Sequence, residues 1–170
     1  MLSKKLLDAL TEQVNFEFYS SYTYLAMSAY AESIDFMGVA NYFRVQAKEE
    51  LDHAMKFYGY LFQKGGFVEL GKIDAPTIKY DNVKSLFDAA YHHEQLVTEK
   101  IYHLADIATE EREHATLSLL QWFIDEQVEE ENNFITILKK VKRFEDNLTG
   151  MYMLDDELAT RVYVPIPTQA

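Results

Sequence analysis

The sequence predicts an all-α protein, a four-helix bundle with one long crossover between its second and third helices and a short fifth helix at the C-terminal end. Three observations support this fold class. Only 6 Gly and 3 Pro occur among 170 residues, and the prolines leave 1–75 and 77–164 uninterrupted. Apolar residues recur three and four positions apart in four segments of similar length. One connection is far longer than the others, and we expect a single domain over 1–170.

The first helix is expected over about 4–34 and the second over about 36–64. Ser3 is a suitable N-cap for the first helix, and Gly65 with Gly66 supplies a left-handed stop after the second. Because so few residues separate the two helices, we expect them to form an antiparallel pair.

A slip in the apolar stripe divides the long stretch that follows into two helices. The stripe of the third helix reads Val83, Phe87, Ala90, Glu94, Val97, Ile101, Leu104, Ala108. That frame predicts positions 111 and 115, whereas the next stripe begins at Thr116, so a tight turn falls within about 109–113. The third helix is therefore expected over about 83–109 and the fourth over about 113–143.

The crossover, at 65–82, is long enough to return along the whole bundle. The 17 residues of 65–81 reach about 56 Å when extended, and a helix of about 28 residues is roughly 42 Å long. The second and third helices can therefore run parallel. The fifth helix is expected over about 147–160 and a tail over 161–170.

Composition excludes several kinds of partner and site. With 16 Lys+Arg against 28 Asp+Glu the net charge is −12, and no basic patch occurs, so nucleic acid is a poor partner. The chain has no cysteine, which excludes disulfides, iron–sulfur clusters and thiolate zinc sites. No stretch reaches the roughly 18 apolar residues of a membrane helix, and acids interrupt the N-terminus before any signal sequence. We therefore expect no membrane association and a cytoplasmic location.

Each of the four long stripes carries one acid near the middle of its helix. These acids are Glu17, Glu50, Glu94 and Glu130. Mid-helix residues meet at the same height whichever way each helix runs, so the four carboxylates converge. His53 lies one turn after Glu50, Gln127 one turn before Glu130, and Tyr24 two turns after Glu17 on the same faces.

Four buried carboxylates would repel one another strongly, and no Lys or Arg lies on these stripes to offset them. Two divalent cations would balance the four negative charges. Glu50 and His53 form a Glu-x-x-His motif, which is typical of di-iron and di-manganese sites in helical bundles. Oxygen ligands with one imidazole favour iron or manganese over structural zinc, although zinc competes for such a site. Taken singly, each acid could equally be a solvated boundary residue.

The acidic run from Asp125 to Glu131 allows two interpretations. A run of charges is ordinarily a solvated helix face. Alternatively, Glu126 and Glu129 form an outer cation site together with Glu49, which precedes Glu50. The residues alone leave both interpretations open.

Over 1–165 the chain resembles the prokaryotic non-haem ferritins. The resemblance is carried by Glu17 with Tyr24, by the segment Glu49-Glu50-Leu51-Asp52-His53-Ala54, by Glu94, and by Trp122 followed by Glu126-Gln127-Val128-Glu129-Glu130. It implies a homo-oligomeric shell of 24 subunits that stores iron and has ferroxidase activity. Fe(II) would be oxidised to Fe(III) by O₂ or hydrogen peroxide.

The resemblance also implies a role for each site residue. Glu17, Glu50 and His53 would bind the first iron, and Glu50, Glu94 and Glu130 the second, with Gln127 nearby. A third iron would bind Glu49, Glu126, Glu129 and Glu130. Tyr24 would hydrogen-bond the site or supply an electron.

Two departures separate the chain from related families. Bacterioferritins and rubrerythrin-type proteins carry a second Glu-x-x-His, where this chain has Gln127-Val128-Glu129-Glu130. Leu51 stands where bacterioferritins keep a haem-ligating methionine, so no haem is expected. A DNA-protecting mini-ferritin is disfavoured because the chain lacks a basic tail and has a fifth helix.

Two other functions use the same residues differently. One is peroxide reduction or substrate oxygenation at the same metal site, without storage. The other is a structural helical oligomer with no metal.

Aromatic and apolar residues off the stripes indicate subunit interfaces. Tyr19 and Tyr22 are expected at an interface, whereas Phe18 and Leu25, beside the stripe, are expected to widen the core face. On the second helix, four further residues are expected to seek a partner: Tyr42, Tyr58, Leu61 and Phe62.

Overall fold

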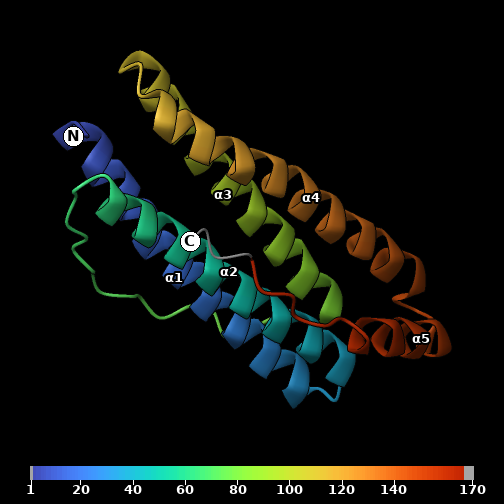
Figure 1. The fold of residues 1–170 in the computed structure, drawn as a ribbon. Coiled ribbons are helices and arrows are strands. Elements are labelled where there is room, and N and C mark those ends of the chain that lie inside the picture. Colours follow the sequence, from blue (N-terminus) through green and yellow to red (C-terminus); the bar gives the residue numbers. More distant parts are fainter. Residues whose placement is uncertain (1, 167–170) are drawn as a thin grey trace.

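The computed structural model describes residues 2–166 and contains five helices. They are α1 (Lys4–Ser33), α2 (Met37–Gln63), α3 (Val83–Glu110), α4 (His114–Phe144) and α5 (Leu148–Ala159). Figure 1 shows the hairpins α1–α2 and α3–α4 side by side, with α5 across one end of the bundle. The predicted fold class is confirmed, and each helix end differs from its expected position by at most one residue.

Local signals in the sequence explain where the helices begin and end. Ser3 Oγ accepts a hydrogen bond from Leu6 N (3.0 Å), which caps α1, and Gly65 ends α2 at φ 73°. The turn predicted from the stripe slip is present, with Arg112 at φ 56°. Asp35 likewise adopts φ 62°, so Phe36 becomes the N-cap of α2 and the helix begins one residue later than predicted.

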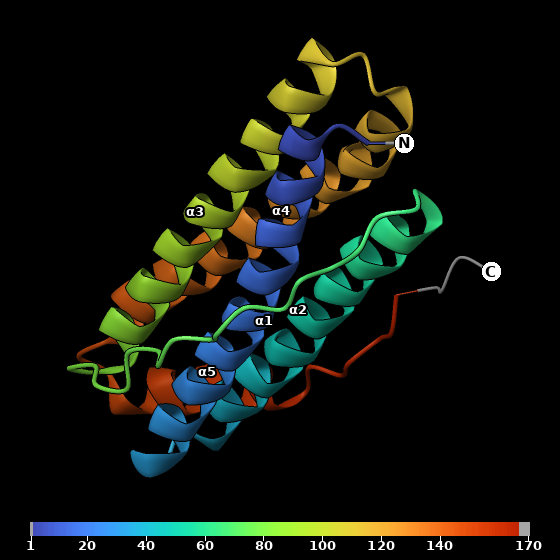
Figure 2. The same cartoon turned by 90° about the vertical axis from the view of Figure 1, so that its left-hand side faces the viewer.

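The crossover passes along α1 from one end of the bundle to the other (Figure 2). Asn15 of α1 holds the crossover against the helix through two hydrogen bonds. Its Nδ2 donates to Glu69 O (3.1 Å), and its Oδ1 accepts from Gly71 N (2.6 Å). Val68, within the crossover, is buried in one of the apolar clusters of the core. This return places α2 and α3 parallel, as predicted (Figure 1).

The apolar core consists of two clusters separated by a polar layer. One cluster, toward α5, includes Tyr24 and Phe134, whose rings stack 5.8 Å apart. The other includes Phe57 and Phe123, which stack at 3.9 Å. Buried acids, amides and two histidines lie at mid-bundle height. The polar layer in the middle of the core is therefore enclosed by tightly packed apolar side chains on both sides.

Helix α5 docks on α2 through a close backbone approach. A Cβ added at Gly38 would lie 1.7 Å from the carbonyl oxygen of Asp155. The Asp155 carboxylate also accepts a hydrogen bond from Val39 N (2.8 Å), which satisfies a free N–H in the first turn of α2. Position 38 therefore requires glycine, because any larger residue would clash with the backbone of α5.

We expect Gly38→Ala to lower the free energy of unfolding by about 1–3 kcal/mol, because α5 must move away from α2. Gly59→Ala is the matched control, since Gly59 is helical and a Cβ there meets nothing within 4 Å among the described residues. The control is expected to raise stability by up to about 1 kcal/mol. Thermal unfolding and hydrogen exchange of α5 measure both, and equal melting temperatures would contradict the docking contact.

Some surface expectations were wrong. Tyr42 and Leu61 are buried within the subunit, because Tyr42 packs edge-on against Phe43 and Leu61 lies in the second apolar cluster. Leu25 does not widen the core and is 50% exposed. Tyr22 and Phe62 are exposed as expected.

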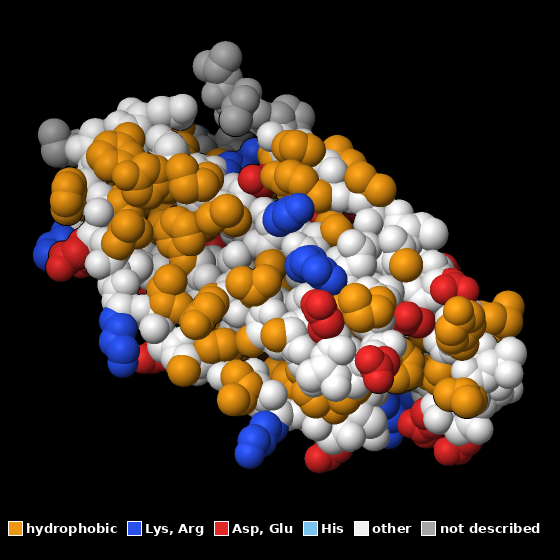
Figure 3. Space-filling model, turned by 90° about the horizontal axis from the view of Figure 1, so that it is seen from below, with side chains coloured by type: hydrophobic (Ala, Val, Ile, Leu, Met, Phe, Trp, Pro, Cys, Tyr) orange, Lys and Arg blue, Asp and Glu red, His pale blue; other side chains and the backbone are white. Residues whose placement is uncertain are grey.

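Figure 3 views the molecule from below, where hydrophobic side chains gather most densely at the upper left and charged side chains lie among them toward the right. Exposed apolar residues of α1 and the crossover are Tyr22, Leu25, Phe67, Leu70, Ile73 and Ile78. Within residues 2–166, no helix is both long enough and apolar enough to cross a membrane.

Candidate metal centre

Three predicted ligands from α1 and α2 meet in the polar layer. Glu17, Glu50 and His53 each offer a ligand atom within 4.8 Å of the others, and all three are buried. Glu50 and His53 lie one helical turn apart, with His53 Nδ1 3.3 Å from Glu50 Oε2. Trp122 and Phe123 contact the imidazole edge-on and limit its rotation.

Two glutamines hold these carboxylates in place. Gln13 Nε2 donates to Glu17 Oε1 (2.8 Å), and Gln46 Nε2 donates to Glu50 Oε1 (3.0 Å). Each glutamine precedes its glutamate by four residues, so the pair lies on one helix face. Sequence reasoning missed both roles, although this repeated Gln-x-x-x-Glu spacing was a usable signal.

The opposite hairpin supplies the remaining predicted residues. Glu94 of α3 accepts hydrogen bonds from Tyr24 Oη and, at 3.0 Å, from Gln127 Nε2. Gln127 also donates to Thr98 Oγ1 (3.3 Å). Glu130 of α4 is also buried, and it lies close enough to Glu50 for the charge of Glu50 to raise its pKa. The structure thus brings Tyr24, Gln127 and all four mid-helix acids into one layer.

Several atoms in this layer have no hydrogen-bond partner among the described residues. They are Glu17 Oε2, Gln46 Oε1, Glu50 Oε2, His53 Nε2 and Glu130 Oε2. A buried polar atom without a partner costs about 1–3 kcal/mol, so five in one site require an explanation. All five are nitrogen or oxygen atoms of the type that binds Fe²⁺, Mn²⁺ or Zn²⁺. The donor set therefore fits metal ions.

The site retains protons when no cation is present. Burial, together with the neighbouring Glu50 charge, raises the pKa of Glu17 to about 8 and that of Glu130 to about 8. Burial also raises the pKa of Glu94 well above its usual value. Burial opposes the charge on His53, yet the Glu50 carboxylate outweighs it and raises the His53 pKa to about 10.

Metal binding should therefore release protons. Glu17 and Glu130 hold protons at pH 7, and a ligand must be deprotonated before it binds a metal. Zn²⁺ affinity should consequently fall as the pH falls below 8, by about tenfold per unit for each proton displaced. Calorimetry in buffers of different ionisation enthalpy should give at least one proton released per subunit, and fewer in Glu17→Gln. Zero release would contradict this electrostatic description.

The outer acids are not assembled in the same way. Across residues 2–166, the group of Glu17, Glu50 and His53 is the only one with three or more such ligand atoms within 4.8 Å of one another. Glu49 is instead paired with Arg161 Nη2 at 2.5 Å. Glu126 is partly buried and Glu129 is exposed.

His93 is a buried histidine that was not among the site residues predicted from the sequence. Its Nε2 lies 2.8 Å from Ser20 Oγ, and its ring meets Tyr24 edge-on. Burial lowers its pKa, which favours the neutral ring. The His93 ring therefore packs against Tyr24 and helps to fix its position. In the sequence, the only sign of this role is that His93 precedes Glu94.

Comparisons with known proteins agree with this arrangement. A family model described as a ferritin-like domain matches residues 7–144. The bacterial non-heme ferritin of Staphylococcus aureus (strain MRSA252) is 40% identical over 163 residues, which cover 96% of this chain and 98% of that protein. The corresponding protein of Staphylococcus haemolyticus (strain JCSC1435) is 39% identical with the same coverage.

Solved structures are equally similar. An engineered closed form of the Archaeoglobus fulgidus ferritin has a TM-score of 0.95 and 38% identity, covering 96% of this chain and 100% of that one. A structure of the open-pore ferritin from the same archaeon has a TM-score of 0.94, with 95% of this chain covered. The chain therefore belongs to the ferritin-like family and, within it, to the non-haem ferritins of bacteria and archaea.

Proposed function

We infer that this chain, as a non-haem ferritin, stores iron and acts as a ferroxidase that oxidises Fe(II) to Fe(III). The observation that best supports the location of this activity is the mid-bundle layer of buried carboxylates with unpartnered oxygen atoms. Iron is both substrate and cargo. Its redox chemistry gives the overall reaction 4 Fe²⁺ + O₂ + 4 H⁺ → 4 Fe³⁺ + 2 H₂O, with hydrogen peroxide as the alternative oxidant.

We assign Glu17, Glu50 and His53 to the first iron, because their ligand atoms already lie within 4.8 Å of one another. Glu50 is central, and its Oε2 has no hydrogen-bond partner among the described residues, so it is suited to bridge two ions. Glu94 and Glu130 would complete the second position, with Gln127 at its edge. Four carboxylates and two Fe²⁺ then sum to zero charge, which removes the repulsion that keeps the site protonated.

Residues around the ligands prepare the site. Gln13 and Gln46 each engage one carboxylate oxygen and leave the other for the metal. Tyr24 donates its hydroxyl hydrogen to Glu94 and is suited to deliver an electron, with the carboxylate accepting its proton. The two apolar clusters exclude bulk water from both sides.

Further assignments follow from the family. We propose a shell of 24 copies whose cavity receives the Fe(III), and a third iron position near Glu49, Glu126 and Glu129. We propose no haem, because Leu51 replaces the methionine that would bind it. Cytoplasmic location and the lack of a nucleic-acid partner stay predictions of the sequence.

Anaerobic titration with Fe(II), followed by mixing with O₂, tests the di-iron assignment. We expect two tightly bound ions per subunit, as at a di-iron carboxylate site. Oxidation should then be complete for those two ions within the first rapid phase. One ion or none bound tightly per subunit would overturn the assignment.

A further inference from the structure

Arg161, two residues after the end of α5, contacts Glu49, one of the outer acids. Its Nη2 donates to Glu49 Oε2 at 2.5 Å, and its Nη1 donates to the Tyr42 carbonyl at 3.3 Å. The guanidinium also lies over the Tyr42 ring, with Cζ 4.1 Å from the centroid. Both partners of the ion pair are only 20% exposed. Three contacts therefore fix this arginine, unlike a solvated surface ion pair.

The segment that carries Arg161 is itself held against α2. Asn41 Nδ2 donates to the carbonyl of Arg161 (3.0 Å), and Tyr163 Oη donates to Asp52 Oδ2 (2.7 Å). Figure 1 shows the segment after α5 returning along α2. Its anchors, Glu49 and Asp52, adjoin the proposed ligands Glu50 and His53 in sequence. The tail thus fastens to the turns of α2 that carry the metal ligands.

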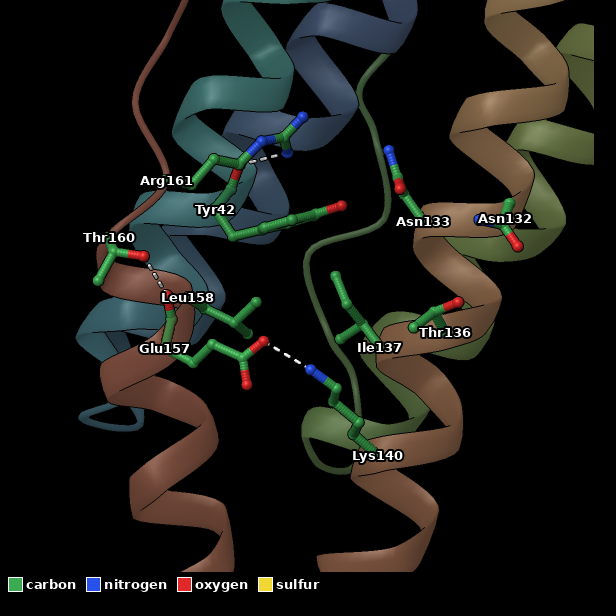
Figure 4. A pocket seen from close by; sticks show the side chains of 10 residues that line it. All are labelled: Tyr42, Asn132, Asn133, Thr136, Ile137, Lys140, Glu157, Leu158, Thr160 and Arg161. Carbon is green, nitrogen blue, oxygen red and sulfur yellow. Dashed lines mark hydrogen bonds and ion pairs between the residues drawn. The ribbon is translucent and has the colours of Figure 1, made fainter.

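Arg161 also borders a hollow of about 390 Å³ lined by residues of α2, α4, α5 and the segment after α5. Figure 4 shows Arg161 and Tyr42 on one side of this hollow and Asn133 on the other. Lys140 lies in the same hollow but pairs with Glu157 at 2.5 Å. Arg161, in contrast, is the charged side chain of this hollow that is paired with an outer acid, Glu49.

We propose that Arg161 is a tethered counter-ion that takes the place of a metal cation at Glu49 and must be displaced before Glu49 binds one. This rests on the proposed function and deepens it. A guanidinium and a metal ion compete for the same carboxylate oxygen, and their like charges repel at this range. Arg161 therefore weakens binding of a third ion at the outer acids relative to the two inner ions.

Titration of the assembled protein with Zn²⁺, measured by calorimetry, tests the counter-ion role of Arg161 without redox chemistry. In the unmodified protein we expect two tight ions and a weaker third. Arg161→Gln should tighten the third ion by roughly tenfold or more, because a competing charge at contact distance is removed. Arg161→Met should give the same gain, and adding Glu49→Gln to either variant should abolish it.

Lys140→Gln is the matched control, because it makes the same charge change in the same hollow without touching Glu49. It should leave the third ion as it is in the unmodified protein. Unchanged third-ion affinity in both Arg161 variants, or an equal gain in Lys140→Gln, overturns the proposal while the two inner ions remain bound. Failure of the unmodified protein to bind two inner ions would instead overturn the proposed function, and the counter-ion role with it.

Discussion

Glu17→Ala and His53→Ala are each expected to abolish rapid aerobic oxidation of Fe(II), with initial rates lower by roughly a hundredfold or more. Each change removes a ligand atom from the group whose members lie within 4.8 Å of one another. Glu17 is the only one of the three assigned ligands on α1, and His53 is the only imidazole among them, so either loss leaves the first iron position with two of its three ligands. The increase of Fe(III) absorbance after mixing with O₂ measures the rate.

Folding must be preserved for this result to be meaningful. Circular dichroism and sedimentation should match the unmodified protein, because the two apolar clusters on either side of the layer are unchanged. In Glu17→Ala, the relief of carboxylate repulsion also offsets part of the cavity that the alanine leaves. Glu99→Gln removes one negative charge at an exposed position of α3 outside the set of ligands and should oxidise Fe(II) normally. Unmodified rates in Glu17→Ala or His53→Ala would remove the site assignment.

The second large effect concerns assembly. Tyr22 and Leu25 lie three residues apart on one face of α1 and are 49% and 50% exposed in the single subunit. The double variant Tyr22→Glu/Leu25→Glu should dissociate the shell into smaller species, because carboxylates would be buried where subunits meet. Sedimentation at micromolar concentration distinguishes the two states.

Ser118→Glu adds a charge at an exposed position of α4 and serves as the control, with a sedimentation coefficient equal to that of the unmodified protein. An unmodified protein that sediments as a stable monomer of 19.8 kDa would contradict both the assembly and the storage cavity. A double variant that still forms the full shell would show that this face of α1 lies outside the interface.

Helix positions were predictable because their signals are local. The left-handed stop at Gly65 and the N-cap at Ser3 are determined by residues within one turn. The slip between Ala108 and Thr116 located the α3–α4 turn, since a stripe cannot change frame within a straight helix. The pairing of Glu50 with His53 was equally predictable, because helical spacing alone places both residues on one face.

Contacts between distant segments could not be predicted in this way. Arg161 and Glu49 are 112 residues apart, and no periodicity links a tail to the middle of α2. Tyr42 lies off the predicted stripe, yet it is buried because α5 and the tail widen the covered face of α2. The burial of His93 likewise depends on Ser20 and Phe16 of the neighbouring helix.

Iron retention after aerobic loading tests the central claim most directly. The assembled protein is given an excess of Fe(II) in air, separated from free iron by gel filtration and analysed for iron per subunit, with Glu17→Ala in parallel. Storage driven by the mid-bundle site predicts iron far above the two ions of a di-iron centre, and much slower loading in Glu17→Ala. Retention of about two irons per subunit, the occupancy of a di-iron site alone, would contradict storage and indicate a dedicated oxidase.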